Sequence, residues 1–196
     1  MSKNRENGKN TENGKNKEKT KNNAKKNTKR LVFSALMVAM SIVIGIVCKA
    51  YLTLSPVMRI TFDNMPIILL GFMFGPVYSI MAAVAGDIIS ALVAGYAPTP
   101  LITVGAAAIG LVAGVLPKYI IKRKGFFASL GVTLSAHIIG SVIIKTYALA
   151  DLYSLEFLPT LLLRAPLYIA ISLAEAYLIY IILKNKQIIG LTEDRK

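Results

Sequence analysis

The sequence is poor in the residues that build metal sites and disulfides. Among 196 residues it has one cysteine, Cys48, one histidine, His137, and no tryptophan. A single cysteine excludes a disulfide within the chain, and one His with one Cys cannot form a His/Cys metal cluster. Cys48 ends an apolar run, where a small buried hydrophobic residue is expected. The composition therefore gives no metal site.

Catalytic and nucleotide-binding motifs are also missing. The sequence contains no G-x-S-x-G, no P-loop and no G-x-G-x-x-G. We therefore expect no catalytic residues and no cofactor, and any uphill transport must draw on an ion gradient or on a partner protein. An intramembrane enzyme that uses Asp63 and Asp87 as acid and base on a lipid-linked substrate is the least supported alternative, because their spacing matches no known motif.

Acidic residues are scarce and the basic residues are unevenly spread. The chain has 10 Asp and Glu against 23 Lys and Arg, and residues 1–30 hold 11 of the basic ones with three Glu. This polar segment cannot bury enough surface to offset ordering, so we expect residues 1–30 to be disordered. It lacks the interleaved aromatic residues of a nucleic-acid binder. No signal peptide is expected, since thirty polar residues precede the first apolar run.

What the chain does contain is long apolar runs. Hydrophobic residues make up 55% of the sequence and the mean hydropathy is +0.57. These values predict an all-α, polytopic protein of the cell membrane, with a membrane domain over residues 31–184 and a polar tail over 185–196. The six expected transmembrane helices are Leu31–Cys48, Thr61–Phe74, Val77–Gly95, Leu101–Ile121, Phe126–Ala148 and Phe157–Leu183. The second is short for a full crossing.

The basic residues predict the orientation of the spans. Six spans place both termini on one side of the membrane. With both termini in the cytoplasm, the basic tail, the cluster at 118–124, Lys184 and Lys186 all lie inside, in agreement with the positive-inside rule. The basic tail also favours anionic lipid. Gly75-Pro76 is then a tight cytoplasmic turn.

Polar side chains interrupt the apolar runs at selected depths. Asp87 lies eleven residues after Pro76, so roughly 16 Å above the inner face at 1.5 Å per residue. Arg164 lies eight residues after Glu156, roughly 12 Å below the outer face. Glu175 falls nearer the cytoplasm and is assigned no role. Charges inside a membrane mark partners or wet cavities, so we expect a cavity that opens outward. Its candidate residues are Arg59, Asp63, Asp87, Tyr96, Lys145, Arg164 and Tyr168.

Each charged candidate also has a structural alternative. Arg164 and Asp87 can pair with each other as a buried salt bridge. Lys145 can extend its stem to the membrane interface. Asp63, which the sequence places on the outer side, can serve as a helix cap or first-turn carboxylate.

The uncharged candidates have alternatives of the same kind. His137 on an apolar face is more typical of a hydrogen-bonded packing residue than of a ligand. Tyr168 is equally suited to packing. Ala35 and Ala39 lie four residues apart on one helix face, which permits close approach of another helix either within this chain or from a partner.

Six short motifs lie at intervals along the apolar part of the chain. They are Ala35 with Ala39, Arg59-Ile-Thr-Phe-Asp63-Asn-Met-Pro66, Gly71-Phe-Met-Phe-Gly75-Pro76, Gly86-Asp87, Tyr96-Ala-Pro-Thr-Pro100-Leu-Ile-Thr-Val-Gly105 and Thr160-Leu-Leu-Leu-Arg164-Ala-Pro166. Taken together, these motifs resemble the substrate-binding S components of energy-coupling factor (ECF) vitamin transporters, of the folate type. The resemblance covers about residues 29–185.

The resemblance implies a six-helix fold with an outward pocket and a first loop, about residues 49–58, that acts as a gate. It implies a complex with a transmembrane coupling protein and two cytoplasmic ATPases, so that ATP is used by the partners. Ala35 and Ala39 would face the coupling protein. The whole bundle would topple in the membrane to expose its pocket to the cytoplasm.

The inventory of side chains suits folate. Its glutamate tail is a dianion, which cations at the mouth would hold. Its pterin ring offers N–H donors to a carboxylate, and flat apolar walls would enclose it. The expected cations are Arg59, Lys145 or Arg164, the carboxylates Asp63 or Asp87, and the walls Phe62, Tyr96 and Tyr168. Another anionic vitamin, or a stand-alone ion-coupled carrier, remains an alternative.

Overall fold

The computed structural model describes the backbone of residues 3–55, 57–95, 97–120 and 125–184, and side chains from residue 18 onward except at 119 and 120. The chain divides into two units, Met1–Phe33 and Ser34–Lys196. The described residues are helical apart from turns, loops and one isolated β-bridge. The predicted tail at 185–196 and part of the basic cluster at 118–124 lie outside them.

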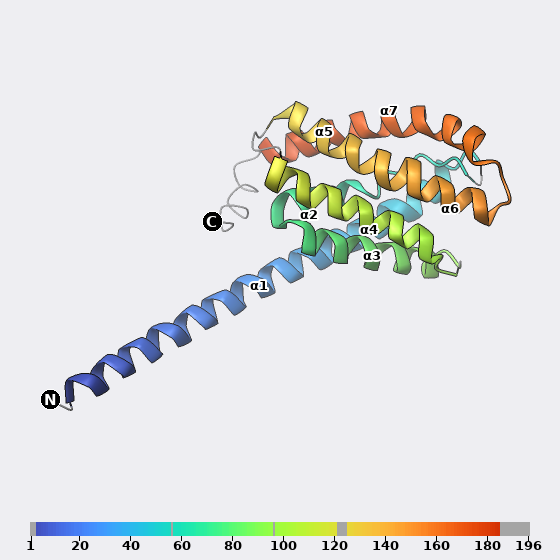
Figure 1. The fold of residues 1–196 in the computed structure, drawn as a ribbon. Coiled ribbons are helices and arrows are strands. Elements are labelled where there is room, and N and C mark those ends of the chain that lie inside the picture. Colours follow the sequence, from blue (N-terminus) through green and yellow to red (C-terminus); the bar gives the residue numbers. More distant parts are fainter. Residues whose placement is uncertain (1–2, 56, 96, 121–124, 185–196) are drawn as a thin grey trace. The chain divides into compact units, whose positions relative to one another are not determined.

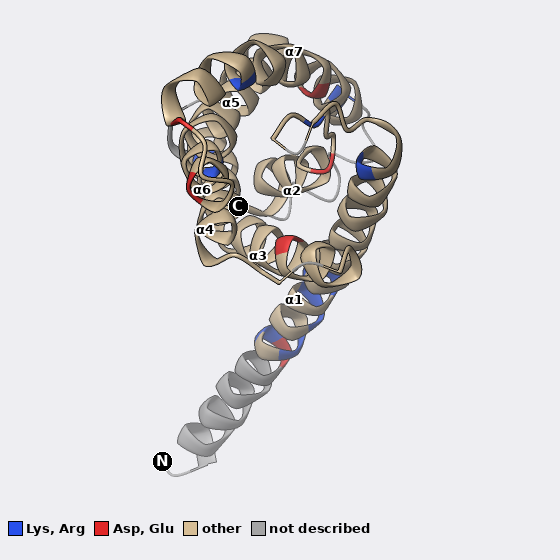
Figure 2. Ribbon diagram, turned by 90° about the vertical axis from the view of Figure 1, so that its right-hand side faces the viewer, with Lys and Arg blue, Asp and Glu red and all other residues tan. Residues whose placement is uncertain are grey.

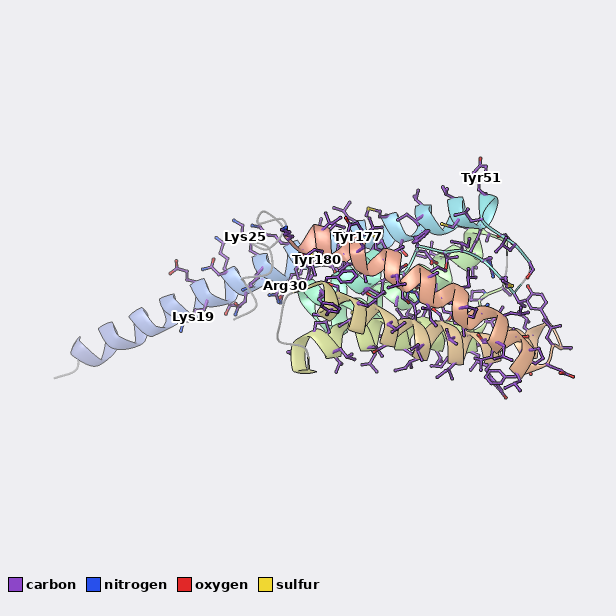
Figure 3. The ribbon with its side chains drawn as sticks, turned by 90° about the horizontal axis from the view of Figure 1, so that it is seen from above. Lys19, Lys25, Arg30, Tyr51, Tyr177 and Tyr180 are labelled. Carbon is purple, nitrogen blue, oxygen red and sulfur yellow. The ribbon has the colours of Figure 1, made fainter. Side chains whose placement is uncertain are left out.

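The first unit is the beginning of helix α1 (Lys3–Tyr51), which continues into the second unit. Figure 3 labels Lys19, Lys25 and Arg30 along it. Residues 3–30 are thus helical in this structure, where the composition predicts disorder. The physical reason is that extending an existing helix avoids the cost of nucleation, and Lys and Glu are good helix formers.

The second unit is a bundle of helices with apolar exteriors (Figure 1). After the end of α1 it contains α2 (Met65–Phe74), α3 (Pro76–Val93), α4 (Pro100–Val115), the π-helix η1 (Leu116–Ile120), α5 (Phe126–Ala136), the π-helix η2 (His137–Ile144), α6 (Lys145–Leu152) and α7 (Phe157–Lys184). Within the described ranges, five stretches are long and apolar enough to cross a membrane, and α2 is a shorter apolar helix.

Helix α2 is the centre of the bundle. Most of its residues are buried, including Ile68 and Leu70 with no exposed surface. A helix that is apolar on every side must be surrounded by other elements. Figure 2, which looks along the bundle, shows α2 inside the outline formed by the other helices. By contrast, large apolar side chains of α7 such as Leu162 are exposed, as expected for contact with lipid.

The Gly75-Pro76 turn joins α2 and α3 as predicted. Gly75 has a φ of +89°, a conformation that residues with a Cβ avoid. Pro76 lies in the first turn of α3, where its missing N–H costs no hydrogen bond. A Cβ on Gly114 of α4 would stand 2.2 Å from Cα of Pro76, so this glycine lets α4 pack directly on the turn.

The predicted spans match the observed helices to within a few residues, with two exceptions. The first span was predicted from Leu31, but α1 begins at Lys3. The second span was predicted from Thr61, but α2 begins at Met65, with residues 63 and 64 in a turn before it. Pro66 lies in the first turn of α2, where a proline costs no hydrogen bond, and this position favours a helix start next to it. The single predicted span over 126–148 runs on to Leu152 as α5, η2 and α6.

Candidate functional site

Asp87 lies between two other helices. Its Oδ2 accepts a 2.8 Å hydrogen bond from Oγ1 of Thr103 on α4, and its Oδ1 lies 3.7 Å from Nζ of Lys145 on α6. The two charged side chains are 17% and 16% exposed. Two of the structural alternatives are therefore wrong. Asp87 does not pair with Arg164, and Lys145 turns into the bundle instead of reaching for the interface.

A glycine creates the room for Lys145. A Cβ added to Gly105 of α4 would meet Cγ of Lys145 at 2.6 Å and the carbonyl oxygen of Gly140 at 3.0 Å. The lysine stem therefore crosses α4 where that helix has no side chain. This crossing brings the ammonium group within reach of Asp87.

Two further cations, Lys49 and Arg59, lie at the same end of the bundle. Lys49 is half-buried near the end of α1, and its Nζ donates to the carbonyl of Ser90 at 3.4 Å. It is close enough to interact electrostatically with Arg59, Asp63, Asp87 and Lys145. Within the described part of the chain, neither Lys49 nor Arg59 has a carboxylate at ion-pair distance. Lys49 is a site candidate that the sequence analysis missed, because the end of a span is an ordinary place for lysine.

Asp63 lies deeper than predicted. Helix α2 has 10 residues, so the turn before it lies only roughly 15 Å from the cytoplasmic end of that helix, near the level of Asp87. By this estimate Asp63 lies below the outer side on which the sequence places it, because α2 is short. The capping alternative is wrong as well, since Asn64 occupies the N-cap position and no side chain there makes a capping bond.

The Asp63 turn is fastened to α1. Its carbonyl accepts a 2.5 Å hydrogen bond from Oγ of Ser41, and its side chain packs on Gly45, where an added Cβ would lie 3.4 Å from Cβ of Asp63. One carboxylate oxygen accepts from the Asn64 amide at 3.2 Å. The carboxylate is half-buried in the middle of the bundle and is not paired with Asp87.

The loop between α1 and α2 folds as a small hairpin. Thr53 and Arg59 form an antiparallel bridge, the amide of Ile60 donates to the carbonyl of Leu52 at 3.1 Å, and the amide of Leu54 donates to the carbonyl of Met58 at 3.0 Å. We call residues 52–55 and 57–60 the first loop.

Arg164 joins the first loop to the helices behind it. It is 3% exposed on α7. Its Nη1 donates to the carbonyl of Val57, and its Nη2 lies 3.3 Å from both the carbonyl of Ser141 and the hydroxyl of Tyr168. The guanidinium also stacks over the Tyr168 ring, 5.1 Å from its centroid.

Tyr168 is therefore part of the wall that supports Arg164. It forms a buried apolar cluster with Val142 and Ile171, and Ile60 and Phe62 pack against this cluster. The packing alternative for Tyr168 accounts for these contacts. The end of the first loop at Ile60, and Phe62 just after it, are thus held against α7 and η2.

A separate polar pair lies buried between η2 and α7. Nε2 of His137 lies 2.7 Å from Oε2 of Glu175, and Nδ1 lies 3.1 Å from Oγ of Ser141. Both members of the pair are 0% exposed. The expectation that His137 is a hydrogen-bonded packing residue is confirmed. Its partner Glu175 was given no role, because only the fold brings two residues 38 positions apart together.

The remaining predicted residues are Tyr96, Ala35 and Ala39. Tyr96 lies outside the described residues. Both alanines are exposed on α1 beside Leu36 and Met40, which are 62% and 44% exposed. Packing within the chain therefore does not account for this pair. Among the described residues, no group of three or more His, Cys, Asp or Glu side chains is arranged to hold a metal ion.

The charges are layered along the bundle. Counted along α3, α5 and α7, Asp87, His137 and Glu175 lie roughly 14–17 Å from the cytoplasmic ends of their helices. Lys145 and Arg164 lie roughly 28–30 Å from those ends. Lys49 is two residues from Tyr51, which Figure 3 labels at the opposite end of the bundle from Tyr180. The backbone positions of these cations thus lie nearer the outer end than those of the carboxylates, and the long side chain of Lys145 reaches down to Asp87.

Apolar helices with a layered charged interior define a membrane-embedded binding protein. Comparison with known proteins identifies the family of this chain. The family model for the ECF transporter substrate-specific component matches residues 29–186. The chain belongs to this family, whose members are membrane-embedded, bind small vitamin substrates and work with an ECF module rather than act as enzymes.

Solved structures share the fold. A crystal structure of FolT bound with folic acid has a TM-score of 0.64 and 20% sequence identity, and the match covers 78% of this chain and 91% of the FolT chain. A crystal structure of the S component for biotin from an ECF-type ABC transporter has a TM-score of 0.59 and 19% sequence identity, and the match covers 81% of this chain and 93% of the other. No curated protein sequence matches the chain significantly.

Proposed function

We propose that this protein captures folate at the outer face of the membrane as the S component of an ECF-type importer. The observation that carries the proposal is the pair of half-buried cations, Lys49 and Arg59, which lack a carboxylate partner among the described residues. Leaving cations half-buried and unpaired is unfavourable unless an anion joins them. An anionic substrate supplies that partner.

The layering of charge supports a substrate with two different ends. An anionic end would meet Lys49 and Arg59 at the outer level, with Lys145 already shared with Asp87. An end that carries N–H donors would reach Asp63 in the middle of the bundle. Folate has this polarity, with two carboxylates at one end and a pterin ring at the other. Phe62, which packs beside the Tyr168 cluster, is an apolar surface at the intermediate level.

Biotin is the second candidate, favoured by the likeness to a solved biotin S component. It too has a carboxylate at one end and ring N–H donors at the other. The layered charge therefore supports a molecule of this type, and the choice of folate rests on the sequence motifs and the FolT likeness. A stand-alone ion-coupled carrier is the third candidate.

We further propose that a transmembrane coupling protein docks on the exposed face of α1 around Ala35 and Ala39, and that two cytoplasmic ATPases supply the energy. Exposed small residues allow another helix to approach closely. ATP would then be consumed by the partners, with no cofactor on this chain.

The test is calorimetric titration of the purified chain with folate, with biotin and with the dimethyl ester of folic acid, which keeps the shape but removes the charge. Binding of folate near 1:1 without ATP, with the ester at least tenfold weaker, is expected. Preference for biotin would transfer the substrate assignment. Uptake would also be measured in proteoliposomes that contain this chain alone. Uptake under these conditions, abolished by an ionophore, would refute the partner-driven mechanism.

A further inference from the structure

We infer that Arg164 is a clasp that holds the first loop closed, and that it does not bind the anionic end of the substrate. The inference assigns a role within the proposed binding site. Its structural part, the clasp itself, concerns the ligand-free protein and does not depend on which substrate is bound.

The first loop makes most of its hydrogen bonds within itself. The hydrogen bonds of Leu54, Ser55, Met58 and Ile60 stay within the hairpin, and that of Thr53 returns to Lys49 at its base. Among the described residues, the bond from Nη1 of Arg164 to the carbonyl of Val57 is the polar contact that ties the outer part of this loop to another helix.

The guanidinium of Arg164 already donates to acceptors on the protein. Nη1 is bonded to Val57 and Nη2 to Ser141 and Tyr168, all acceptors on the protein. Nε has no partner and is buried. A carboxylate bound side-on needs two adjacent N–H groups. It would have to displace at least one of these acceptors, whereas Lys49 and Arg59 have no ion pair to break.

The acceptor that the first loop offers to Arg164 is a backbone group. Val57 contributes its backbone carbonyl, so the bond forms only when the loop backbone lies against α7. A charge-assisted bond of this kind shifts an opening equilibrium by about ten- to a hundredfold. Arg164 would therefore set how fast the loop opens, and with it how fast a bound substrate leaves.

The experiment compares hydrogen–deuterium exchange of the first loop in wild type, Arg164→Lys and Arg164→Ala, each full-length and ligand-free in nanodiscs. Lysine keeps the charge but cannot reach all three acceptors at once. We expect exchange at Leu54, Met58 and Ile60 to rise about tenfold or more in both variants, with α4 unchanged. If Arg164→Ala also loosens α4, the comparison rests on Arg164→Lys. Unchanged loop exchange in a variant with intact α4 would overturn the clasp.

Ligand kinetics separate the clasp from charge reading. Arg164→Lys should raise the dissociation rates of folate and of its uncharged dimethyl ester by the same factor. Lys49→Met, the matched control, should weaken folate and leave the ester unaffected. If Arg164→Lys raises the dissociation rate of folate and leaves that of the ester unchanged, the inference is overturned. Arg164 would then bind the anionic end of the substrate. If the chain binds no folate, the proposed function fails, and the exchange experiment still decides the clasp.

Discussion

Nζ of Lys145 on α6 lies 3.7 Å from Oδ1 of Asp87 on α3, and this pair connects helices that are far apart in the sequence. Both side chains are mostly buried, so removing one partner leaves a poorly solvated charge. Asp87→Ala should reduce the free energy of unfolding by more than the ~1 kcal/mol of a surface pair and by less than the ~5 kcal/mol of a fully buried one.

The measurement is denaturant unfolding in detergent, with Lys145→Met/Asp87→Leu as the second variant. Because this double variant removes both charges, it should regain much of the stability that Asp87→Ala loses. Equal losses in the two variants would mean that the charges do not interact.

Gly105→Ala tests the crossing of Lys145 over α4. The new methyl group would stand 2.6 Å from Cγ of Lys145, so the stem must move away from Asp87. We expect a loss of about 1–3 kcal/mol of stability and weaker substrate binding. The control is Gly125→Ala, where no atom of the described residues lies within 4 Å of the added Cβ. Thermal unfolding of both variants would show whether the two positions differ.

The buried pair of His137 and Glu175 should be a stabilising contact. Glu175→Ala strands a buried histidine nitrogen and should cost about 3 kcal/mol or more. Glu175→Gln keeps an acceptor for Nε2 and should cost less. Leu178→Ala is the control, because Leu178 is on the same helix and 42% exposed. Thermal unfolding that ranks Glu175→Ala with Leu178→Ala would contradict this role.

The two unpaired cations should determine affinity for charged ligands. Lys49→Met and Arg59→Met should each weaken folate by about tenfold or more if the substrate carboxylates join them. Binding of the dimethyl ester should hardly change. Titration calorimetry at low and moderate salt provides the measurement, and equal losses for both ligands would indicate damage to the fold instead.

The exposed alanine pair should matter for transport and not for binding. Ala39→Leu should leave substrate affinity intact and reduce uptake in cells that contain the partner proteins, because it blocks close helix approach. Ala170→Leu, at an exposed position on α7, is the control for added bulk. Joint loss of binding and uptake in Ala39→Leu would point to misfolding.

Much of the fold follows from local sequence. Apart from the starts of α1 and α2, the long apolar runs predict the membrane-spanning helices to within a few residues, and Gly75-Pro76 predicts its turn because only glycine tolerates that φ. The start of α2 was misplaced by four residues, since hydropathy continues through Thr61 and Phe62 while Pro66 fixes the helix start. The helix over residues 3–30 does not follow from composition, because composition carries no information on continuity with the helix that follows.

The sequence by itself determined that this is a helical membrane protein with charges inside its spans, because hydrophobic period and burial cost are properties of the local chain. Only the tertiary structure decided which charges meet. Asp87 pairs with Lys145 and not with Arg164, and Glu175 pairs with His137, because helix packing sets the distances between these side chains. The attachment of Arg164 to a loop carbonyl was equally hidden, since any residue offers that acceptor and only the fold brings it within reach.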